Sequence, residues 1–239
     1  MTAFFDYPKS AAFGRVVPKN KIYEHAGANT ALKDLFVRDV DQIVWRFKLA
    51  TETINLSATG SVPEIQVFTV SLKTGKLDEV ILRAIDKAIP YPLMFELTWR
   101  GKRKATAAFK RPSEADSTKW VISEYFATDW VSEDTARAPL PVALNLGVLY
   151  DRMLTALMPA EPAAPLQDGA DIQTRVERLE AIRAKAREVE RIKARLAREK
   201  QYNKRVAINA ELRMANQELA ELKSTDAVRA DALSAATNK

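Results

Sequence analysis

Several residue types that build common active sites are missing from this chain or nearly so. It has no cysteine and a single histidine, His25, among 239 residues. The lack of cysteine excludes disulfides, thiolate metal sites and a cysteine nucleophile. One histidine excludes a multi-histidine metal centre, and no nucleophile elbow or phosphate-binding glycine motif accompanies it. The sequence therefore indicates no metal and no cofactor.

Long apolar runs are also absent. No stretch reaches the roughly 18 consecutive apolar residues that a membrane-spanning helix needs. The first residues, MTAFFDYPKS, lack the basic and apolar regions of a signal peptide. With 47% hydrophobic and 28% charged residues, the composition is typical of a globular protein. We therefore expect a cytoplasmic protein that does not bind a membrane.

Positive charge is concentrated in one segment. The chain has a formal net charge of +6. Between Arg175 and Arg205 there are twelve basic and five acidic residues, a balance of +7, so the remainder sums to −1. Only this segment therefore supports a hypothesis of binding to a polyanion.

The first part of the chain alternates between helical and strand patterns. Residues 1–28 are interrupted by prolines and glycines and are expected to be irregular. The spacing of apolar residues predicts a helix over 29–47, a short strand near 54–56, a strand over 65–72, a helix over 77–89, strands over 93–100, 103–110 and 120–125, and a helix over 142–157. Residues 1–157 are thus predicted to form an α+β domain, with a mainly antiparallel sheet and flanking helices.

The stretch Ile89-Pro90-Tyr91-Pro92 joins a helical pattern directly to a strand pattern. Each proline lacks an N–H group and disfavours helix in the residue before it, so the pair ends the helix and starts an extended segment. The stretch either serves only to end the helix and start the strand, or it is part of a docking surface. Tyr91 is correspondingly a core aromatic or a partner-binding residue, and we favour the core.

The last part of the chain reads as a long helical arm. Residues 158–170 contain three prolines and a glycine and are predicted to be a linker. Residues 171–223 contain neither, and they carry coiled-coil-like apolar spacing that includes Leu212 and Leu219. The polar stretch 197–205 marks a stutter, a bend or the turn of a helical hairpin. A tail over 224–239 is predicted to be disordered.

A helix of this length cannot bury its apolar seam alone. It must fold back on itself, form a homodimer or dock on another protein, so Leu212 and Leu219 are candidate partner-binding residues. Five arginines recur on the first half of the arm at helical spacing: Arg183, Arg187, Arg191, Arg195 and Arg198. They form one stripe that either binds nucleic-acid phosphates or is the solvated face of a coil, and we favour the coil.

Two further groups of residues carry alternative hypotheses. Glu64, Asp86 and Asp129 are the carboxylates available to a metal-dependent nuclease, whose metal ion would activate water. The segment YFATDW ends in Trp130, and it either closes a corner of the core or forms an aromatic surface for a partner. We favour the corner and keep Trp130 as a candidate partner-binding residue.

Six segments together resemble one family. They are PKNKIYEHA, VDQIVWRFKLATETINL, EIQVFTVSL, IDKAIPYPLMFELTWRGKRK, YFATDW and EKQYNKRVAINAEL. The chain resembles the bacterial and archaeal domain-of-unknown-function family numbered 4391 over most of its length. This resemblance implies a gene neighbourhood of restriction-type helicases and DNA methyltransferases, which would be the protein partners.

The function expected from these observations is that of a non-catalytic accessory subunit in a DNA restriction-modification or phage-defence system. It would bind a helicase or methyltransferase, with DNA as a further possible ligand. The alternatives are a metal-dependent nuclease subunit and a stand-alone nucleic-acid-binding protein. Clustering of the three carboxylates in one pocket would favour the nuclease.

Overall fold

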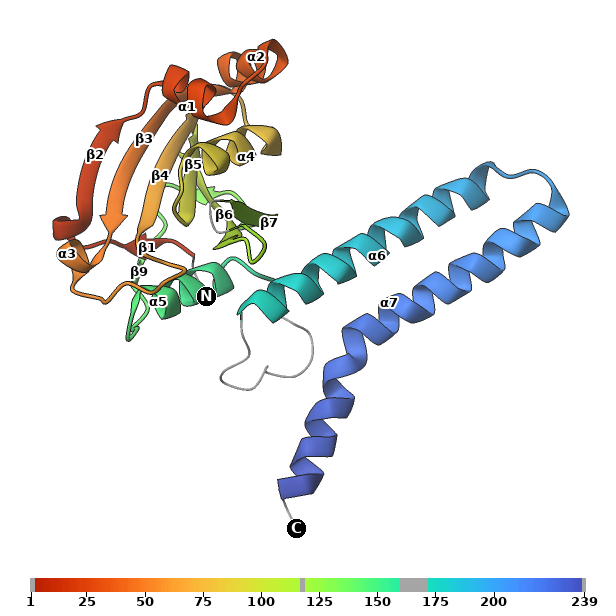
Figure 1. Ribbon diagram of the computed structural model, residues 1–239. Helices are drawn as coiled ribbons and strands as arrows, with labels where there is room; N and C mark the ends of the chain where they lie inside the picture. Colours follow the sequence, from red (N-terminus) through yellow and green to blue (C-terminus); the bar gives the residue numbers. More distant parts are fainter. Residues whose placement is uncertain (1–2, 117–118, 160–171, 238–239) are drawn as a thin grey trace. The chain divides into compact units, whose positions relative to one another are not determined.

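The computed structural model describes residues 3–116, 119–159 and 172–237, with side chains described as far as Lys223. The chain divides into two compact units, Met1–Met158 and Pro159–Lys239 (Figure 1). Most of the predicted linker, residues 158–170, lies outside the described residues. The disordered tail predicted from residue 224 stays a prediction, because only its backbone is described.

The first unit contains short and long elements of both kinds. They are β1 (Phe5–Asp6), the 3-10 turn η1 (Lys9–Ala11), β2 (Ala12–Val16), α1 (Lys19–Ala26), α2 (Thr30–Asp39), β3 (Val40–Leu49), α3 (Thr51–Ile54), β4 (Ile65–Leu72), α4 (Glu79–Ala88), β5 (Leu93–Trp99), β6 (Lys102–Pro112), β7 (Trp120–Ala127), β8 (Val131–Ser132), β9 (Ala138–Pro139) and α5 (Leu146–Thr155). The second unit contains α6 (Ile172–Arg198) and α7 (Tyr202–Thr237). The chain is thus a mixed α+β protein that ends in two long helices.

A mixed, mostly antiparallel sheet organises the first unit. Its strand order is β2-β3-β4-β5-β6-β7, and β8 also pairs with β6. Neighbouring strands are antiparallel except β4 and β5, which run parallel and are joined through α4. Antiparallel neighbours can be joined by tight turns, whereas a parallel pair needs a crossover, and α4 supplies it. The short strands β1 and β9 form a separate parallel pair.

The helix predicted over 29–47 is wrong beyond Asp39. Asn29 caps α2 by accepting the N–H of Leu32 at 3.0 Å, and the helix ends where β3 begins at Val40. The residues of β3 are rich in β-branched and aromatic side chains, which favour strands. Two irregularities interrupt its pairing with β4, between Val40 and Gln42 and between Trp45 and Phe47. Such bulges break the two-residue alternation of a strand, so its apolar residues imitate helical spacing.

Three other predictions also need correction. The described part of residues 1–28 is not irregular, because it contains β1, η1, β2 and α1. Gly14, at φ 69°, lies within β2 where the pairing with β3 shifts register. The short strand predicted at 54–56 is absent, since α3 occupies Thr51–Ile54 and ends at Asn55 with positive φ. The helix predicted from Val142 begins only at Leu146, because the Asn145 side chain caps it by accepting the Val148 N–H.

The main core lies between one face of the sheet and helices α1, α2 and α4 (Figure 1). In β5, Leu93, Phe95 and Leu97 point into this core, while Glu96 and Thr98 alternate onto the other face. α4 presents Ile81 and Ile85 to the same core, both without exposed surface. The βαβ unit of β4, α4 and β5 is therefore the centre of the first unit.

The end of α4 depends on a lysine from a distant strand. In a continuing helix, the N–H of residue 90 would donate to the carbonyl of Asp86, but Pro90 has no N–H. The Lys110 ammonium, from β6, instead donates to the carbonyls of Asp86 and Ile89. It also lies 3.6 Å from the Asp86 carboxylate, and its side chain is 0% exposed. The prolines therefore end α4. Lys110 supplies the donor that Pro90 removes from the Asp86 carbonyl, and it shares the Ile89 carbonyl with the Tyr91 N–H.

The second unit contains a helical hairpin, formed by α6 and the described side chains of α7. The helices run antiparallel, because Lys185 pairs with Glu218 at 2.6 Å and Arg195 pairs with Glu211 (Figure 1). Residues 199–201 form the turn between them. Of the alternatives for the polar stretch 197–205, the structure thus has the hairpin turn. Coiled-coil geometry stays a prediction.

Replacing Lys110 should destabilise the first unit strongly. Lys110→Met keeps the apolar stem but removes the ammonium, which leaves a buried carboxylate unpaired and costs about 3 to 5 kcal/mol. Urea unfolding followed by tryptophan fluorescence isolates this unit, because all four tryptophans lie within it. The matched control, Lys104→Met on the half-exposed part of the same strand, should change the unfolding free energy by less than about 1 kcal/mol. An equally small effect of Lys110→Met would contradict this role.

Candidate functional site

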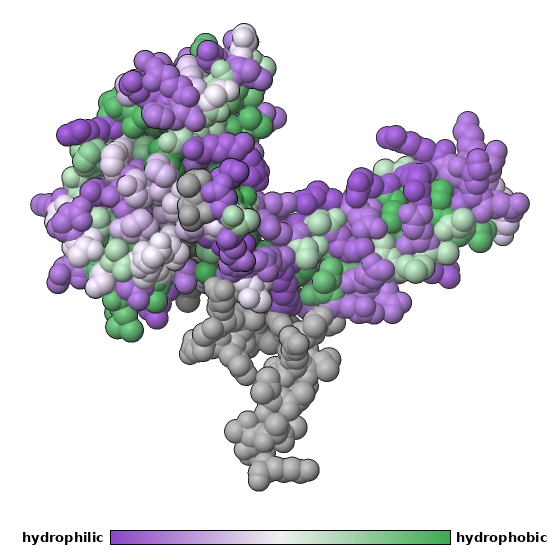
Figure 2. Space-filling view, in the orientation of Figure 1, coloured by the Kyte–Doolittle hydropathy of each residue, from purple (hydrophilic) through white to green (hydrophobic). Residues whose placement is uncertain are grey.

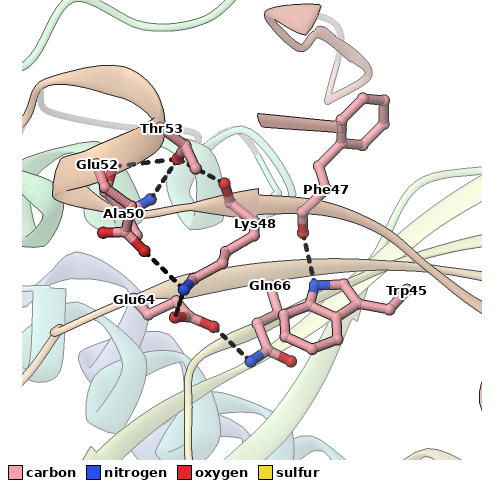
Figure 3. A network of polar contacts seen from close by, with 8 residues as sticks. All are labelled: Trp45, Phe47, Lys48, Ala50, Glu52, Thr53, Glu64 and Gln66. Carbon is pink, nitrogen blue, oxygen red and sulfur yellow. Dashed lines mark hydrogen bonds and ion pairs between the residues drawn. The ribbon is translucent and has the colours of Figure 1, made fainter. Parts of the chain in front are cut away.

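Glu64 is held by a network at the start of β4 (Figure 3). Lys48 lies 3.2 Å from one carboxylate oxygen of Glu64 and 2.6 Å from the carboxylate of Glu52. The Gln66 amide donates to the other Glu64 oxygen at 2.5 Å. Both oxygens of Glu64 are therefore engaged by protein groups, and the network ties β3 and α3 to the start of β4.

The turn that follows β3 belongs to the same network. The Thr53 hydroxyl donates to the Lys48 carbonyl at 2.7 Å and accepts the Ala50 N–H at 2.9 Å (Figure 3). The Trp45 indole N–H donates to the Phe47 carbonyl at 2.9 Å. These bonds satisfy backbone groups next to the bulge in β3 and fix the end of the strand. This arrangement indicates a structural role for the surroundings of Glu64.

Asp86 lies in the core of the first unit with 2% of its surface exposed. The Lys110 ammonium faces one of its carboxylate oxygens, and the Tyr125 hydroxyl donates to the other. Burial raises the pKa of Asp86 to about 6, although Lys110 and Tyr125 oppose the shift. Burial likewise lowers the pKa of Lys110 to about 8. A carboxyl group with this pKa could exchange protons near neutrality, but its burial keeps substrates away from it.

Asp129 is different, because it is exposed on the segment between β7 and β8. Its backbone carbonyl accepts the Thr128 hydroxyl at 2.9 Å. Neighbouring Tyr125 and Phe126 are built into the core, and Phe126 has no exposed surface. Glu64, Asp86 and Asp129 thus have separate partners. Within the described ranges, no group of three or more acidic, histidine or cysteine residues is placed to hold a metal ion.

The candidate partner-binding aromatics lie in different settings. Tyr91 is half-buried, and its N–H donates to the Ile89 carbonyl at 2.9 Å within the proline-rich turn. Trp130 is half-buried against the main core, with its ring centroid 6.4 Å from that of Trp99. Neither position decides between a core and a partner-binding role.

The hairpin buries its apolar seam within itself. Val189 and Ile192 of α6 pack with Ile208 and Ala215 of α7, and all four are buried. The remaining seam residues are partly buried: Leu196, Leu212 and Leu219. In Figure 2, apolar residues of the hairpin are bordered by polar ones. The apolar seam is therefore buried by the two helices of the hairpin, without a second chain. Partner binding by Leu212 and Leu219 stays a prediction.

The arginine stripe lies on the outer face of α6. At about 100° per residue, the five arginines centre about 150° away from Val189, Ile192 and Leu196, the α6 residues that pack against α7. Arg195 reaches across to Glu211. Arg191 and Arg198 are exposed, and no ion pair involves them in the described part of the chain. With nine basic and four acidic residues, α6 carries a balance of +5.

The outer face of α7 carries an apolar stripe that the sequence analysis missed. Tyr202, Val206 and Met214 are 79%, 51% and 65% exposed. With Ala210 they recur every four residues, so they centre about 170° away from the α7 seam. The four-residue spacing of this stripe is visible in the sequence. However, the seam residues of α7 lie in the same stretch of sequence and have a similar spacing. Two apolar stripes on one helix are separable only when the packed partner is known.

Comparison with known proteins assigns the chain to a family. Residues 5–219 match the domain of unknown function 4391, so the chain belongs to this family. The match covers both units. No curated protein and no solved structure matches the chain. Among the described residues, no helix is long and apolar enough to cross a membrane.

The buried acid predicts a distinctive pH dependence. Below the ordinary Asp pKa of 3.8, Asp86 is protonated in the folded and unfolded states alike. As pH rises from 3.8 to about 6, the unfolded chain releases this proton more readily, so folding stability falls. The free energy of unfolding of the natural chain should therefore fall by up to about 3 kcal/mol relative to Asp86→Asn over this range. Urea titrations at several pH values measure it, and parallel curves for both proteins would exclude the shift.

Proposed function

We propose that this chain is a non-catalytic interaction subunit of a DNA restriction-modification or phage-defence assembly. Its helical hairpin binds a large protein partner, a helicase or a DNA methyltransferase, and contacts DNA through the arginine stripe. One observation carries the proposal: α6 and α7 bury their seam against each other and leave two chemically different outer faces exposed. The class of partner follows from the family resemblance alone.

The apolar stripe of α7 is the surface that suits a protein partner. Exposed aromatic and methionine side chains are enriched where proteins bind one another. Tyr202 and Met214 lie on one face of a regular helix, so they can enter a groove of the partner as ordered anchors. This face is separate from the seam, and a partner can therefore bind without opening the hairpin.

The arginine stripe suits phosphate groups. Arginine donates several N–H bonds from a planar group and stays charged at any physiological pH. Arg191 and Arg198 are exposed at the surface, and neither forms an ion pair within 4 Å among the described residues, although Glu188 lies close enough to Arg191 for a weaker electrostatic interaction. The same stripe also supports the second candidate function, a nucleic-acid-binding protein that acts without a partner.

The carboxylates support this assignment over a nuclease. Glu64 has both oxygens engaged, and Asp86 is buried between Lys110 and Tyr125. A catalytic divalent ion needs carboxylate oxygens that are open to it and to water. Asp129 alone is exposed, and a single carboxylate holds such an ion weakly.

Changing the α7 stripe should abolish partner capture. We expect the full-length chain to recover a helicase or DNA methyltransferase from nuclease-treated lysate of its own host, as identified by mass spectrometry. Tyr202→Glu combined with Met214→Glu should reduce this recovery at least about ten-fold, because charge in an apolar contact costs more than about 1.4 kcal/mol.

The matched control is Val142→Glu combined with Leu144→Glu, since these residues are 85% and 88% exposed in the other unit. The control should recover the partner as the natural chain does. Circular dichroism should show unchanged helix content in both variants. Recovery of neither protein class by the natural chain would refute the proposed partner.

Changing the arginine stripe should alter the salt dependence of DNA binding. Arg191→Ala combined with Arg198→Ala should lower the slope of log affinity against log salt by about 1.8 on duplex DNA. The control, Lys204→Ala combined with Arg213→Ala, removes the same charge from α7 and should leave the slope near its natural value. Fluorescence anisotropy at several salt concentrations measures both. Equal slopes in all three proteins would exclude the stripe as a DNA contact.

A further inference from the structure

At one edge of the sheet, the βαβ unit of β4, α4 and β5 has the strand arrangement that nucleotide-binding sheets use. β4 and β5 run parallel, so their carboxyl ends meet at the same edge of the sheet. In open, mostly parallel sheets, ligands bind beyond the carboxyl ends of the strands, and the β4–β5 pair shares this local geometry within a mostly antiparallel sheet. A hollow of about 740 Å³ lies here and is lined by segments distant in sequence: Arg38, Asp39, Thr74, Gly75, Lys76, Trp99, Lys102 and Trp130.

Two tryptophans give this hollow an aromatic wall. The ring centroids of Trp99 and Trp130 lie 6.4 Å apart, and the ring planes meet at 59°. Both side chains are half-buried, so each ring is anchored in the core and partly exposed. A Cβ atom on Gly75 would lie 3.0 Å from the Trp99 ring. Glycine at this position therefore allows the indole to lie against the backbone that follows β4.

Positive charge surrounds the aromatic wall. Lys76 and Lys102 line the hollow, and the Arg100 guanidinium lies 5.3 Å from the Trp99 ring centroid. None of these three cations has an ion pair among the residues that the structure describes. The carboxylate in the lining, Asp39, is already paired with Arg38 at 2.7 Å. The hollow is thus net positive.

Two more lysines add to the charge at this end of the sheet. Lys19 donates to the carbonyl of Val40, at the start of β3, and Lys73 donates to the carbonyl of Val37, in the last turn of α2. Burial lowers the pKa of Lys19, and the nearby charge of Lys73 lowers it further. The two ammonium groups are therefore close enough to repel each other. Asp41 offsets part of this charge at Lys19, and Asp78 does so at Arg38. The lining cations Lys76 and Lys102 are therefore the groups that would attract an anionic ligand.

We propose that this hollow binds single-stranded nucleic acid, with a base against the Trp99–Trp130 pair and phosphates at Lys76, Lys102 and Arg100. Aromatic rings beside a basic surface are the combination by which proteins bind unpaired strands, because every base has a face that can stack. A duplex keeps its bases stacked inside, so it cannot use the tryptophans. The site lies wholly in the first unit, so it is independent of the proposed role of the hairpin.

The test uses the full-length chain and a labelled oligothymidylate of about ten nucleotides, the length that one small binding domain covers. Fluorescence anisotropy should show binding, and stacking should quench part of the tryptophan emission. Trp130→Ala should weaken binding about 5- to 100-fold, as the loss of one stacked base does. The matching duplex should not quench the tryptophans.

A second variant keeps the test valid if Trp130→Ala disturbs folding. Lys76→Ala combined with Lys102→Ala changes only lining cations and should lower the salt slope by about 1.4 on the single strand. The control is Lys9→Ala combined with Lys87→Ala, two exposed lysines outside the lining, which should leave affinity and slope unchanged. Absence of quenching, or equal affinity in the lining and control variants, would overturn the proposal.

Discussion

A lysine ammonium buried at the end of α4 is the interaction on which the first unit depends. Pro90 removes the donor that the Asp86 carbonyl would have in a continuing helix, and Lys110 replaces it. The same ammonium binds the Ile89 carbonyl and faces the Asp86 carboxylate, so one side chain from β6 holds the last turn of α4 and its C-cap. The end of the α4 crossover is thereby attached to β6, while the parallel pairing of β4 and β5 places their carboxyl ends at one edge of the sheet.

The sequence predicted those features that depend on neighbouring residues. The helix before Ile89-Pro90-Tyr91-Pro92 and the strand after it follow from local proline chemistry, and the break in the arm follows from its polar stretch. β3 has the apolar spacing of a helix, because its two bulges shift the apolar residues out of alternation. Lys110 could not be foreseen as a helix cap, since it lies 24 residues from Asp86. The hollow beside Trp99 was missed for the same reason, because four separate segments line it.

Some side chains that could carry a function are engaged in the interior of the first unit, whereas others are exposed. Glu64 and Asp86 are engaged inside the first unit, where their bonds join strands and helices. The exposed side chains form three surfaces. These are the arginines on α6, the apolar stripe on α7, and the cations around two tryptophans in the first unit. The family match spans both units, which is consistent with their acting together. In our proposal, the hairpin recruits a protein while the first unit contacts an unpaired strand.

Hydrogen–deuterium exchange of the full-length chain, alone and with its captured partner, tests this account most directly. We predict that the partner protects backbone amides of α7 around Val206, because a bound protein excludes water from the apolar stripe on the outer face of this helix. The amides around Glu64 and Asp86 should exchange at the same rate with and without the partner. Protection confined to the segments of Glu64 and Asp129, with none on the hairpin, would contradict the role of the hairpin as the binding element.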